Sequence, residues 1–340
     1  MDRRAFIVAL LATYGCGQKE EPKKAAEAPK AAATNAQPRE RIGRLGTLGA
    51  TPRQVQGGNV SIIAERLSEL GYVEGRNLII DYRHAKSEVG LRELASQLVT
   101  SGSQVIYANG PYSLRAARAA TAIIPIVGFD YESNPVAAGY AASLARPGGN
   151  VTGVFLDQPE VSAKQLQLLR DLVPGLTRVA VLFDAAITSA QRESVEGAAR
   201  RLGVTIAPIV WRGSDTLPAA LQSATQDGAR GLIVLSSPNI FTERDRPLIA
   251  DAALKRRLPA ISLLSSFVRD GLLIAYGPVQ KDALRSAANL VAKILDGAAP
   301  GDLPIERPVR YALVINTITA KALGLTIPQS LLMRADEVIQ

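Results

Sequence analysis

Residues 104–130 decide the fold class, and they read QVIYANGPYSLRAARAATAIIPIVGFD. Two apolar runs, at 104–108 and 123–129, have the length and the β-branched residues of buried strands. The segment between them begins with Pro111, a residue suited to the first turn of a helix. A strand, a helix and a second strand in this order form the unit from which parallel sheets are built.

The same unit recurs on both sides of this stretch. Further strands are predicted at 42–48, 77–82, 151–156, 178–183, 204–211, 231–235, 260–264, 272–276 and 311–315. Apolar stripes or helix boundaries predict helices around Val60–Leu70, around Leu91–Leu98, after Pro111, from Pro135 to before Arg146, around Leu166–Leu172, and at 189–202, 217–226, 244–256 and 279–295. Two series of similar length predict an α/β fold with two doubly wound parallel-sheet lobes. In such sheets ligands bind beyond the carboxyl ends of the strands.

Composition excludes several classes of site. The chain of 340 residues has one cysteine and one histidine, so neither an internal disulfide nor a transition-metal site is expected. The formal net charge is +8, but the basic residues are scattered and form no block with interleaved aromatics. No nucleic-acid partner is therefore expected. Some of the positive charges would favour contact with anionic lipid.

The N-terminus is typical of an export signal. A basic start, Met1-Asp2-Arg3-Arg4, precedes a short apolar run that ends at Tyr14, and Cys16 follows. A cysteine directly after the cleavage point marks a bacterial lipoprotein, so residues 1–16 are predicted to be a signal peptide with Cys16 as the lipid attachment site. Thr13 and Tyr14 depart from the usual residues before such a cysteine, and the twin arginines leave the Sec and twin-arginine routes both open.

Residues 17–40 follow as a stretch of Lys, Glu, Ala and Pro without aromatic residues. Such a segment cannot bury enough apolar surface to fold. We expect it to be a disordered tether, with the protein located in the periplasm or at the cell surface and anchored through Cys16.

The predicted strand ends carry small polar residues and a few tyrosines, which suit a small ligand with polar ends. Asp130 or Asp184 would pair with an amine, and the N–H groups after Pro111 would hold a carboxylate. The alternative for each Asp, Asn and Ser is a helix cap or a turn. The candidate ligand-binding residues are Thr47, Thr51, Asn109, Gly110, Tyr112, Ser113, Asp130, Tyr131, Asp184, Ser236, Ser237, Ser265 and Tyr276.

Catalytic patterns are weak. The sequence holds no G-x-S-x-G elbow and no P-loop, and its one histidine, His84, follows a predicted strand among basic residues. Gly43, Gly46 and Gly49 are spaced by three and do not form a dinucleotide fingerprint. No catalytic residue, metal or cofactor is expected.

Several segments resemble one known family, the TrpX-like group of ABC transporter substrate-binding proteins. They are LGYVEGRNL at 70–78 with DYR at 81–83, SLARPGGNVTG at 143–153, YGP at 276–278, LVIN at 313–316 with TAKALGL at 319–325, and RADEVI at 334–339. The resemblance covers about residues 41–340. Two loops depart from it: Ser133-Asn134-Pro135-Val136 stands where the family often has Gly-Asp-Pro-Val, and Asp184-Ala185 where it often has Asn-Pro.

This resemblance implies a type I periplasmic-binding fold, with two lobes joined by a three-stranded hinge and a ligand in the cleft. The implied division is lobe I at 41–153, with 277–305 returning to it, and lobe II at 154–276, with 306–340 returning to it. The hinge is expected near Val151–Gly153 and Tyr276–Pro278.

The function implied is that of an exported solute-binding protein of an ABC importer. It would bind a small polar or amino-acid-like ligand as a monomer and deliver it to a membrane permease without catalysis. A ligand-sensing receptor partner on the same fold is the first alternative, and a Rossmann-like enzyme is the second. A transcription regulator is disfavoured, because a signal and a tether occupy the place of a DNA-binding region.

Overall fold

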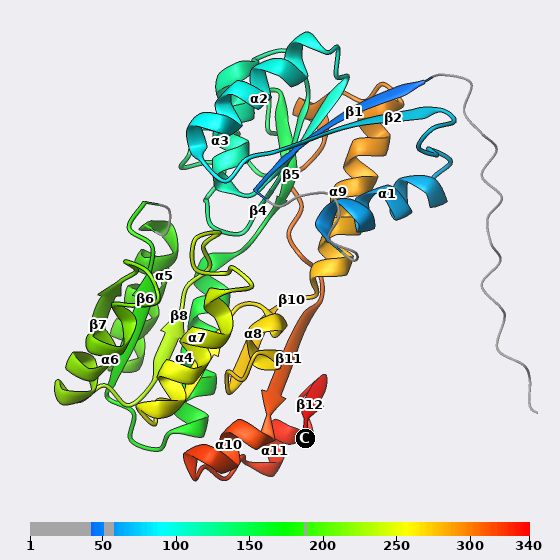
Figure 1. Cartoon of the computed structure of the whole chain (residues 1–340). Coiled ribbons are helices and arrows are strands. Elements are labelled where there is room, and N and C mark those ends of the chain that lie inside the picture. The colour runs from blue at the N-terminus through cyan, green and yellow to red at the C-terminus, as the bar shows by residue number, and fades with distance from the viewer. Residues whose placement is uncertain (1–41, 51–57, 187–188) are drawn as a thin grey trace, which may run out of the picture. The chain divides into compact units, whose positions relative to one another are not determined.

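The computed structural model describes residues 42–50, 58–186 and 189–340, and it contains two sheets with helices on both faces of each (Figure 1). The first sheet is fully parallel in the order β2-β1-β3-β4-β5. Its strands are β1 Gly43–Gly49, β2 Leu78–His84, β3 Val105–Asn109, β4 Ile126–Asp130 and β5 Val151–Phe155. The signal, the tether, Cys16 and Thr51 lie outside the described residues.

Alternation along the strands gives the first sheet two apolar faces. One face packs on α1 (Asn59–Glu69) and α9 (Gln280–Leu295), and the other on α2 (Glu88–Thr100) and α3 (Pro111–Ala120). Helix α9 is therefore part of this lobe, although it lies more than 120 residues beyond β5 in the sequence.

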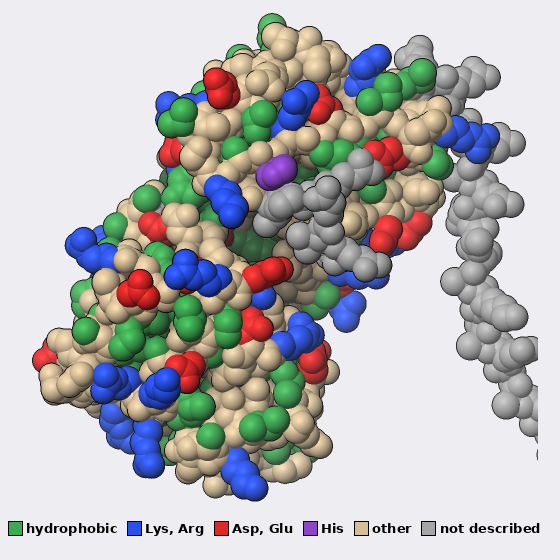
Figure 2. All heavy atoms as spheres, in the orientation of Figure 1, with side chains coloured by type: hydrophobic (Ala, Val, Ile, Leu, Met, Phe, Trp, Pro, Cys, Tyr) green, Lys and Arg blue, Asp and Glu red, His purple; other side chains and the backbone are tan. Residues whose placement is uncertain are grey.

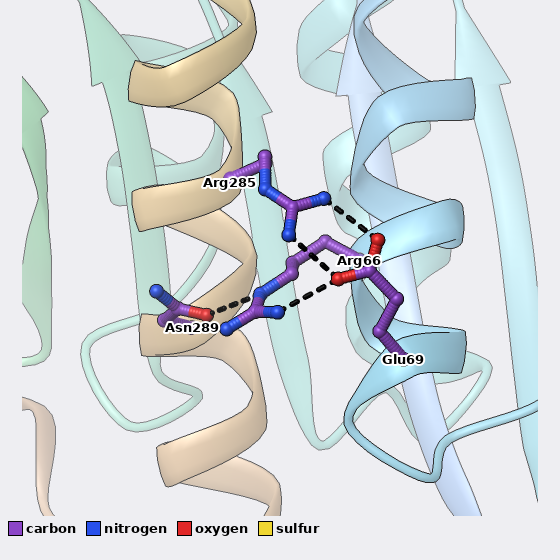
Figure 3. A network of polar contacts seen from close by, with 4 residues as sticks. All are labelled: Arg66, Glu69, Arg285 and Asn289. Atoms are coloured by element: carbon purple, nitrogen blue, oxygen red, sulfur yellow. Dashed lines mark hydrogen bonds and ion pairs between the residues drawn. The ribbon is translucent and has the colours of Figure 1, made fainter. Parts of the chain in front are cut away.

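A cluster of charged side chains fastens α9 to α1 (Figure 3). The two guanidinium nitrogens of Arg285 donate to the two carboxylate oxygens of Glu69 at 2.8 and 2.6 Å. Arg66 donates to Glu69 at 2.7 Å and, through Nε, to Asn289 at 2.9 Å. These charge-assisted bonds hold the pKa of Glu69 down at about 2, chiefly through the bond from Arg285.

The second sheet has the order β12-β11-β10-β9-β8-β6-β7 and is parallel except where β10 meets β11. Its strands are β6 Arg178–Phe183, β7 Thr205–Val210, β8 Leu232–Val234, β9 Ala260–Ser262, β10 Ile274–Pro278, β11 Tyr311–Asn316 and β12 Glu337–Ile339. One face packs on α4 (Gln158–Leu172) and α5 (Ser189–Leu202), and the other on α6 (Leu217–Gln226) and α7 (Asp245–Lys255). The remaining short helices are α8 Ser265–Arg269, the 3₁₀ helix η1 Pro300–Asp302, α10 Thr317–Leu323 and α11 Gln329–Leu332.

The chain passes between the two sheets three times: from β5 to α4, from β10 to α9, and from η1 to β11. The first and third passages are joined by backbone bonds, Glu306 N–H to Gly153 O at 2.8 Å and Phe155 N–H to Glu306 O at 3.0 Å. An Asp157–Arg307 ion pair joins the same two passages. These three passages connect the two lobes.

The predicted helix from Pro135 to before Arg146 is wrong, because the segment forms turns. Asn134 Oδ1 accepts from the backbone N–H groups of Val136 and Ala137, and Gly139 then takes a positive φ of 72°. Since Val136–Gly139 are all exposed, no apolar stripe holds a helix there. No described helix combines the length and apolarity needed to span a bilayer.

Candidate functional site

Two carboxyl groups lie close together, one at the end of β4 and one in the turn that follows it. Asp130 is fully buried and Glu132 is 7% exposed. Asp130 Oδ1 accepts from the backbone N–H groups of Glu132 and Ser133 at 2.8 and 3.2 Å, which fixes the turn. Asp130 Oδ2 is buried and receives no N–H from the described residues.

Burial raises the pKa of Glu132 well above its ordinary value, and the neighbouring charge of Asp130 raises it further. A hydrogen bond between the two carboxyl groups acts in the same direction. Glu132 therefore keeps its proton to a higher pH than an exposed glutamate does, and its carboxyl group forms a pair with that of Asp130.

In the second lobe, Asp184 follows β6 and is 8% exposed. Its Oδ2 accepts from Ser237 Oγ at 2.8 Å and from Asn239 Nδ2 at 2.7 Å, while Oδ1 accepts from Ala186 N–H at 2.9 Å. Gln191 on α5 holds the loop after β8 through two bonds to the Ser236 backbone, at 2.7 and 2.9 Å. The carboxylate of Asp184 is therefore held in one orientation by its own lobe.

Among the described residues, the loop after β8 makes two side-chain hydrogen bonds to the other lobe. Ser236 Oγ donates to Glu132 Oε1, and Asn239 Nδ2 donates to the Tyr112 hydroxyl at 3.1 Å. Gly110 lies at the same contact, because a Cβ on it would be 3.9 Å from Pro238. The strand ends of the two lobes thus face one another at this point.

Helix α3 begins at this contact. Gly110 has a φ of 86°, and its N–H donates to Phe129 O at 2.9 Å, so the chain turns sharply into Pro111. Tyr112 is half-buried, with the Arg115 guanidinium 4.8 Å from its ring centre. Burial and the charge of Asp184 raise the pKa of Tyr112. Ser113 is buried beside it on α3.

Two further predicted residues line a separate hollow on the first lobe, together with Val60, Tyr82 and His84. They are Thr47, which is buried on β1, and Asn109, which ends β3. A relay ties Asn109 to the hinge side of the lobe: Gln280 donates to Asn59 at 3.0 Å, and Asn59 donates to Asn109 at 3.1 Å. His84 is exposed at the end of β2.

Three predicted residues lie apart from the interlobe contact. Tyr131 turns into the core, with its ring centre 4.8 Å from that of Phe129. Ser265 begins α8 and accepts from Arg269 at 3.2 Å. Tyr276 stacks on Tyr311 at 5.7 Å and lines a hollow with Glu160 and Lys164.

Sequence reasoning missed Glu132, Gln191 and Asn239, all of which bind predicted residues. Glu132 lies two residues after Asp130, and Asn239 lies two after Ser237, so spacing offered a signal for both. The sequence offered no signal for Gln191, because this residue bonds a segment 45 residues away.

Comparison with known proteins gives the family. A tyrosine-binding protein of Clostridioides difficile (strain R20291) is 27% identical over 262 residues, which are 76% of this chain and 74% of that protein. The solved structure of a conserved domain protein from Vibrio cholerae matches 88% of this chain and 100% of its own, at 24% identity and a TM-score of 0.80. The structure of an ABC domain in complex with L-Trp, from Streptococcus pneumonia, also matches 88% of this chain and 100% of its own, at 22% identity and a TM-score of 0.78.

These structures share the fold with the present chain. The family described as "ABC transporter substrate binding protein" matches residues 56–339, which is most of the sequence. The resemblance expected from the segments at 70–78 and 143–153 is confirmed, as is the α/β fold with two parallel-sheet lobes. The chain belongs to the ABC transporter substrate-binding protein family.

Proposed function

We propose that this substrate-binding protein takes an amino-acid-like ligand at the contact between its lobes and delivers it to a membrane permease. The observation that carries the proposal is the pair of interlobe bonds, Ser236 to Glu132 and Asn239 to Tyr112. A single loop of the second lobe makes both bonds, so the strand ends of the two lobes close on one another where carboxyl groups gather.

The chemistry of the contact favours an ammonium group. Asp184 and the Asp130–Glu132 pair supply carboxyl oxygens in a buried setting, where charge-assisted bonds are strong. The start of α3 offers backbone N–H groups and the positive end of a helix to a carboxylate. The names of the tyrosine-binding relative and of the L-Trp complex support an amino acid as the ligand class.

In this proposal each lobe moves as a unit. Lobe I comprises residues 41–153 and 277–305, and lobe II comprises residues 154–276 and 306–340. They turn about Val151–Gly153 and Tyr276–Pro278, so that opening breaks the two interlobe bonds and closing remakes them around the ligand. The protein acts as a monomer and carries out no reaction on its ligand.

We further propose that the chain is exported and anchored through a lipid on Cys16, with 17–40 as the tether. A tether holds the closed form near its permease and raises the effective concentration. Metabolic labelling with a radioactive fatty acid should mark the native protein. A Cys16→Ala variant should carry no label, and labelling of that variant would contradict the anchor.

The ligand class is tested by thermal unfolding of the refolded protein, from which any co-purified ligand has been removed. A set of L-amino acids is compared with matched amines that lack the carboxylate and matched acids that lack the amine. A true ligand at about a hundred times its dissociation constant adds about 2.7 kcal/mol. We expect stabilisation by an amino acid and little by either truncated analogue. Stabilisation by sugars alone would contradict the proposal.

Asp184→Asn tests the carboxyl contact directly. Loss of one charge-assisted bond should weaken the amino acid by about tenfold or more in calorimetry. Asp215→Asn is the matched control, since Asp215 is exposed before α6 and should leave the affinity unchanged. Equal affinities of the two variants for the amino acid would show that Asp184 does not contact the ligand.

A further inference from the structure

The edge of the second sheet at which its parallel strands start is strongly basic. Because α4–α7 run antiparallel to the strands that follow them, their C-terminal ends lie at this same edge. We call the basic residues gathered there the basic edge: Arg170, Arg178, Arg200, Arg201, Arg230, Lys255, Arg256 and Arg257. Three acidic residues accompany these eight, namely Asp171, Asp227 and Asp251, which leaves an excess of five positive charges.

Strand register shows that these residues share one edge. Arg230 N–H donates to Arg178 O at 3.1 Å, so the starts of β6 and β8 lie side by side. Leu232 pairs with Ala260, which brings Arg257 to the start of the next strand. Figure 2 shows Lys and Arg side chains gathered at the lower left of the molecule, near α6.

Helix electrostatics account for only part of this charge. Arg170, Arg200, Arg201 and Lys255 lie in last helical turns, where basic residues offset a helix dipole. Each helix end carries roughly half a negative charge, so four ends offset about two of the five excess charges. Arg178, Arg230 and Arg257 lie outside those last turns.

Few partners among the described residues neutralise the basic edge. Lys255 pairs with Asp251 at 2.8 Å, and Arg256 donates to Gln222 at 3.2 Å. No ion pair is found for Arg170, Arg200 or Arg230 in the described part of the chain. A hollow that Arg170, Thr177 and Gly203 help to line opens between the ends of α4 and α5.

The backbone at Arg257 adds an independent observation. Its φ of 53° makes it the one non-glycine residue with a positive φ in the described ranges. The corresponding position after α5 is Gly203, and after α6 it is Gly228. At the end of α7, where glycine would be unstrained, the chain instead carries an exposed arginine.

We propose that the basic edge is a docking surface for the anionic phospholipid headgroups of the membrane beside which an ABC transporter's binding protein works. Unneutralised arginines match the phosphates of such a surface in charge and in hydrogen-bonding geometry. Each basic residue near an anionic bilayer strengthens binding by about fivefold, and salt weakens the attraction because exposed charges are screened.

The test uses the full chain carrying Cys16→Ala, so that no lipid anchor contributes, with vesicles of phosphatidylglycerol and phosphatidylcholine. The edge variant carries Arg170→Gln, Arg200→Gln and Arg230→Gln. Its matched control carries Arg76→Gln, Arg118→Gln and Arg146→Gln, which are exposed residues on the first lobe with the same loss of charge. Vesicle sedimentation measures binding, and the thermal midpoint together with solute binding verifies that both variants fold.

We expect the Cys16→Ala parent to bind phosphatidylglycerol vesicles more tightly than phosphatidylcholine vesicles, and less tightly as salt rises. The edge variant should lose about tenfold or more in affinity, while the control should keep most of it. Equal losses in both variants would assign the effect to overall charge and overturn the proposal. Equal binding of the parent to both lipids, or preference for a soluble polyphosphate over the vesicles, would also overturn it. Solute binding is measured separately, so either outcome leaves the proposed function to its own test.

Discussion

At the scale of single residues, Glu69 is the acceptor that joins two helices more than 200 residues apart in sequence. Its pKa of about 2 lies below the ordinary 4.5, so its carboxylate stabilises the fold above pH 4.5. That contribution is lost as the pH falls through 4.5 toward 2. Because the side chain is half-exposed, solvent screening reduces the contribution to about 1 kcal/mol.

Glu69→Gln should therefore lower the free energy of unfolding at pH 7 by about 1 kcal/mol. The difference between wild type and variant should shrink toward pH 2.5, as measured by urea denaturation at each pH. Glu93→Gln, on the exposed face of α2, is the control and should change little at either pH. A difference that did not depend on pH would show that the ion pair is not its source.

Glu132 gives the opposite pH dependence. Its pKa is raised in the folded state by burial and by Asp130, so its contribution to stability is full at low pH and declines as the pH rises above the ordinary glutamate value. Glu132→Gln keeps the neutral shape without the titration. We expect the variant to have a flatter stability profile between pH 5 and 8 than wild type. Parallel profiles would mean that Glu132 does not hold its proton in the folded protein.

At the scale of elements, β4 and β5 approach one another closely because two glycines face each other. Gly153 pairs with Gly128, and a Cβ on Gly153 would lie 2.0 Å from Gly128 O. Gly153→Ala should cost about 3 kcal/mol or more in the free energy of unfolding. Gly197→Ala, in the middle of α5 with its nearest neighbour at 3.6 Å, should instead add about 0.5–1 kcal/mol. Similar effects of both substitutions would contradict the close approach.

Elements with a strong apolar pattern could be predicted from the sequence, and those fixed by tertiary contacts could not. Helices α5 and α6 have the bounds that the sequence predicts, because their apolar stripes meet one sheet. Strand β4 begins at Ile126 rather than at 123, since Ile123 is 89% exposed and lies outside the sheet. The three-residue strand β12 has too little pattern of its own and depends on pairing with β11.

The candidate site also contains some features that the sequence predicts and others that it does not. The structure places Asp130, Asp184, Ser236 and Ser237 at facing strand ends, because each follows a parallel strand and such strands end together. Position after a strand did not distinguish Tyr131, whose ring points into the core, from Tyr112, whose hydroxyl reaches the other lobe. That distinction depends on the direction of each side chain, which the spacing of apolar and polar residues in these loops does not predict.

At the scale of the whole molecule, the bond between Asn239 and Tyr112 offers a test of the proposed closure of the lobes. Asn239→Ala removes the bond to Tyr112 and the bond to Asp184, whereas Tyr112→Phe removes only the first. The interlobe bond, which both variants lose, is worth about 1 kcal/mol, so each variant should quicken ligand dissociation by about fivefold, with association little changed. Stopped-flow kinetics of the two single variants and the double variant give the coupling between the side chains. A coupling of zero would show that this bond is absent from the closed, ligand-bound form.

The return of α9 to the first lobe has a consequence for biosynthesis. Tyr72 donates to Asp296 and Arg66 to Asn289, so bonds that finish this lobe join residues 224 and 223 positions apart. A ribosome that has made β1 to β5 has therefore supplied α1 but not yet α9, the second helix that covers one face of their sheet. Contacts this distant in sequence form slowly. The growing chain thus keeps part of an apolar sheet face uncovered until Leu295 has emerged, which leaves a long interval for chaperones or a translocation machine to engage it before folding.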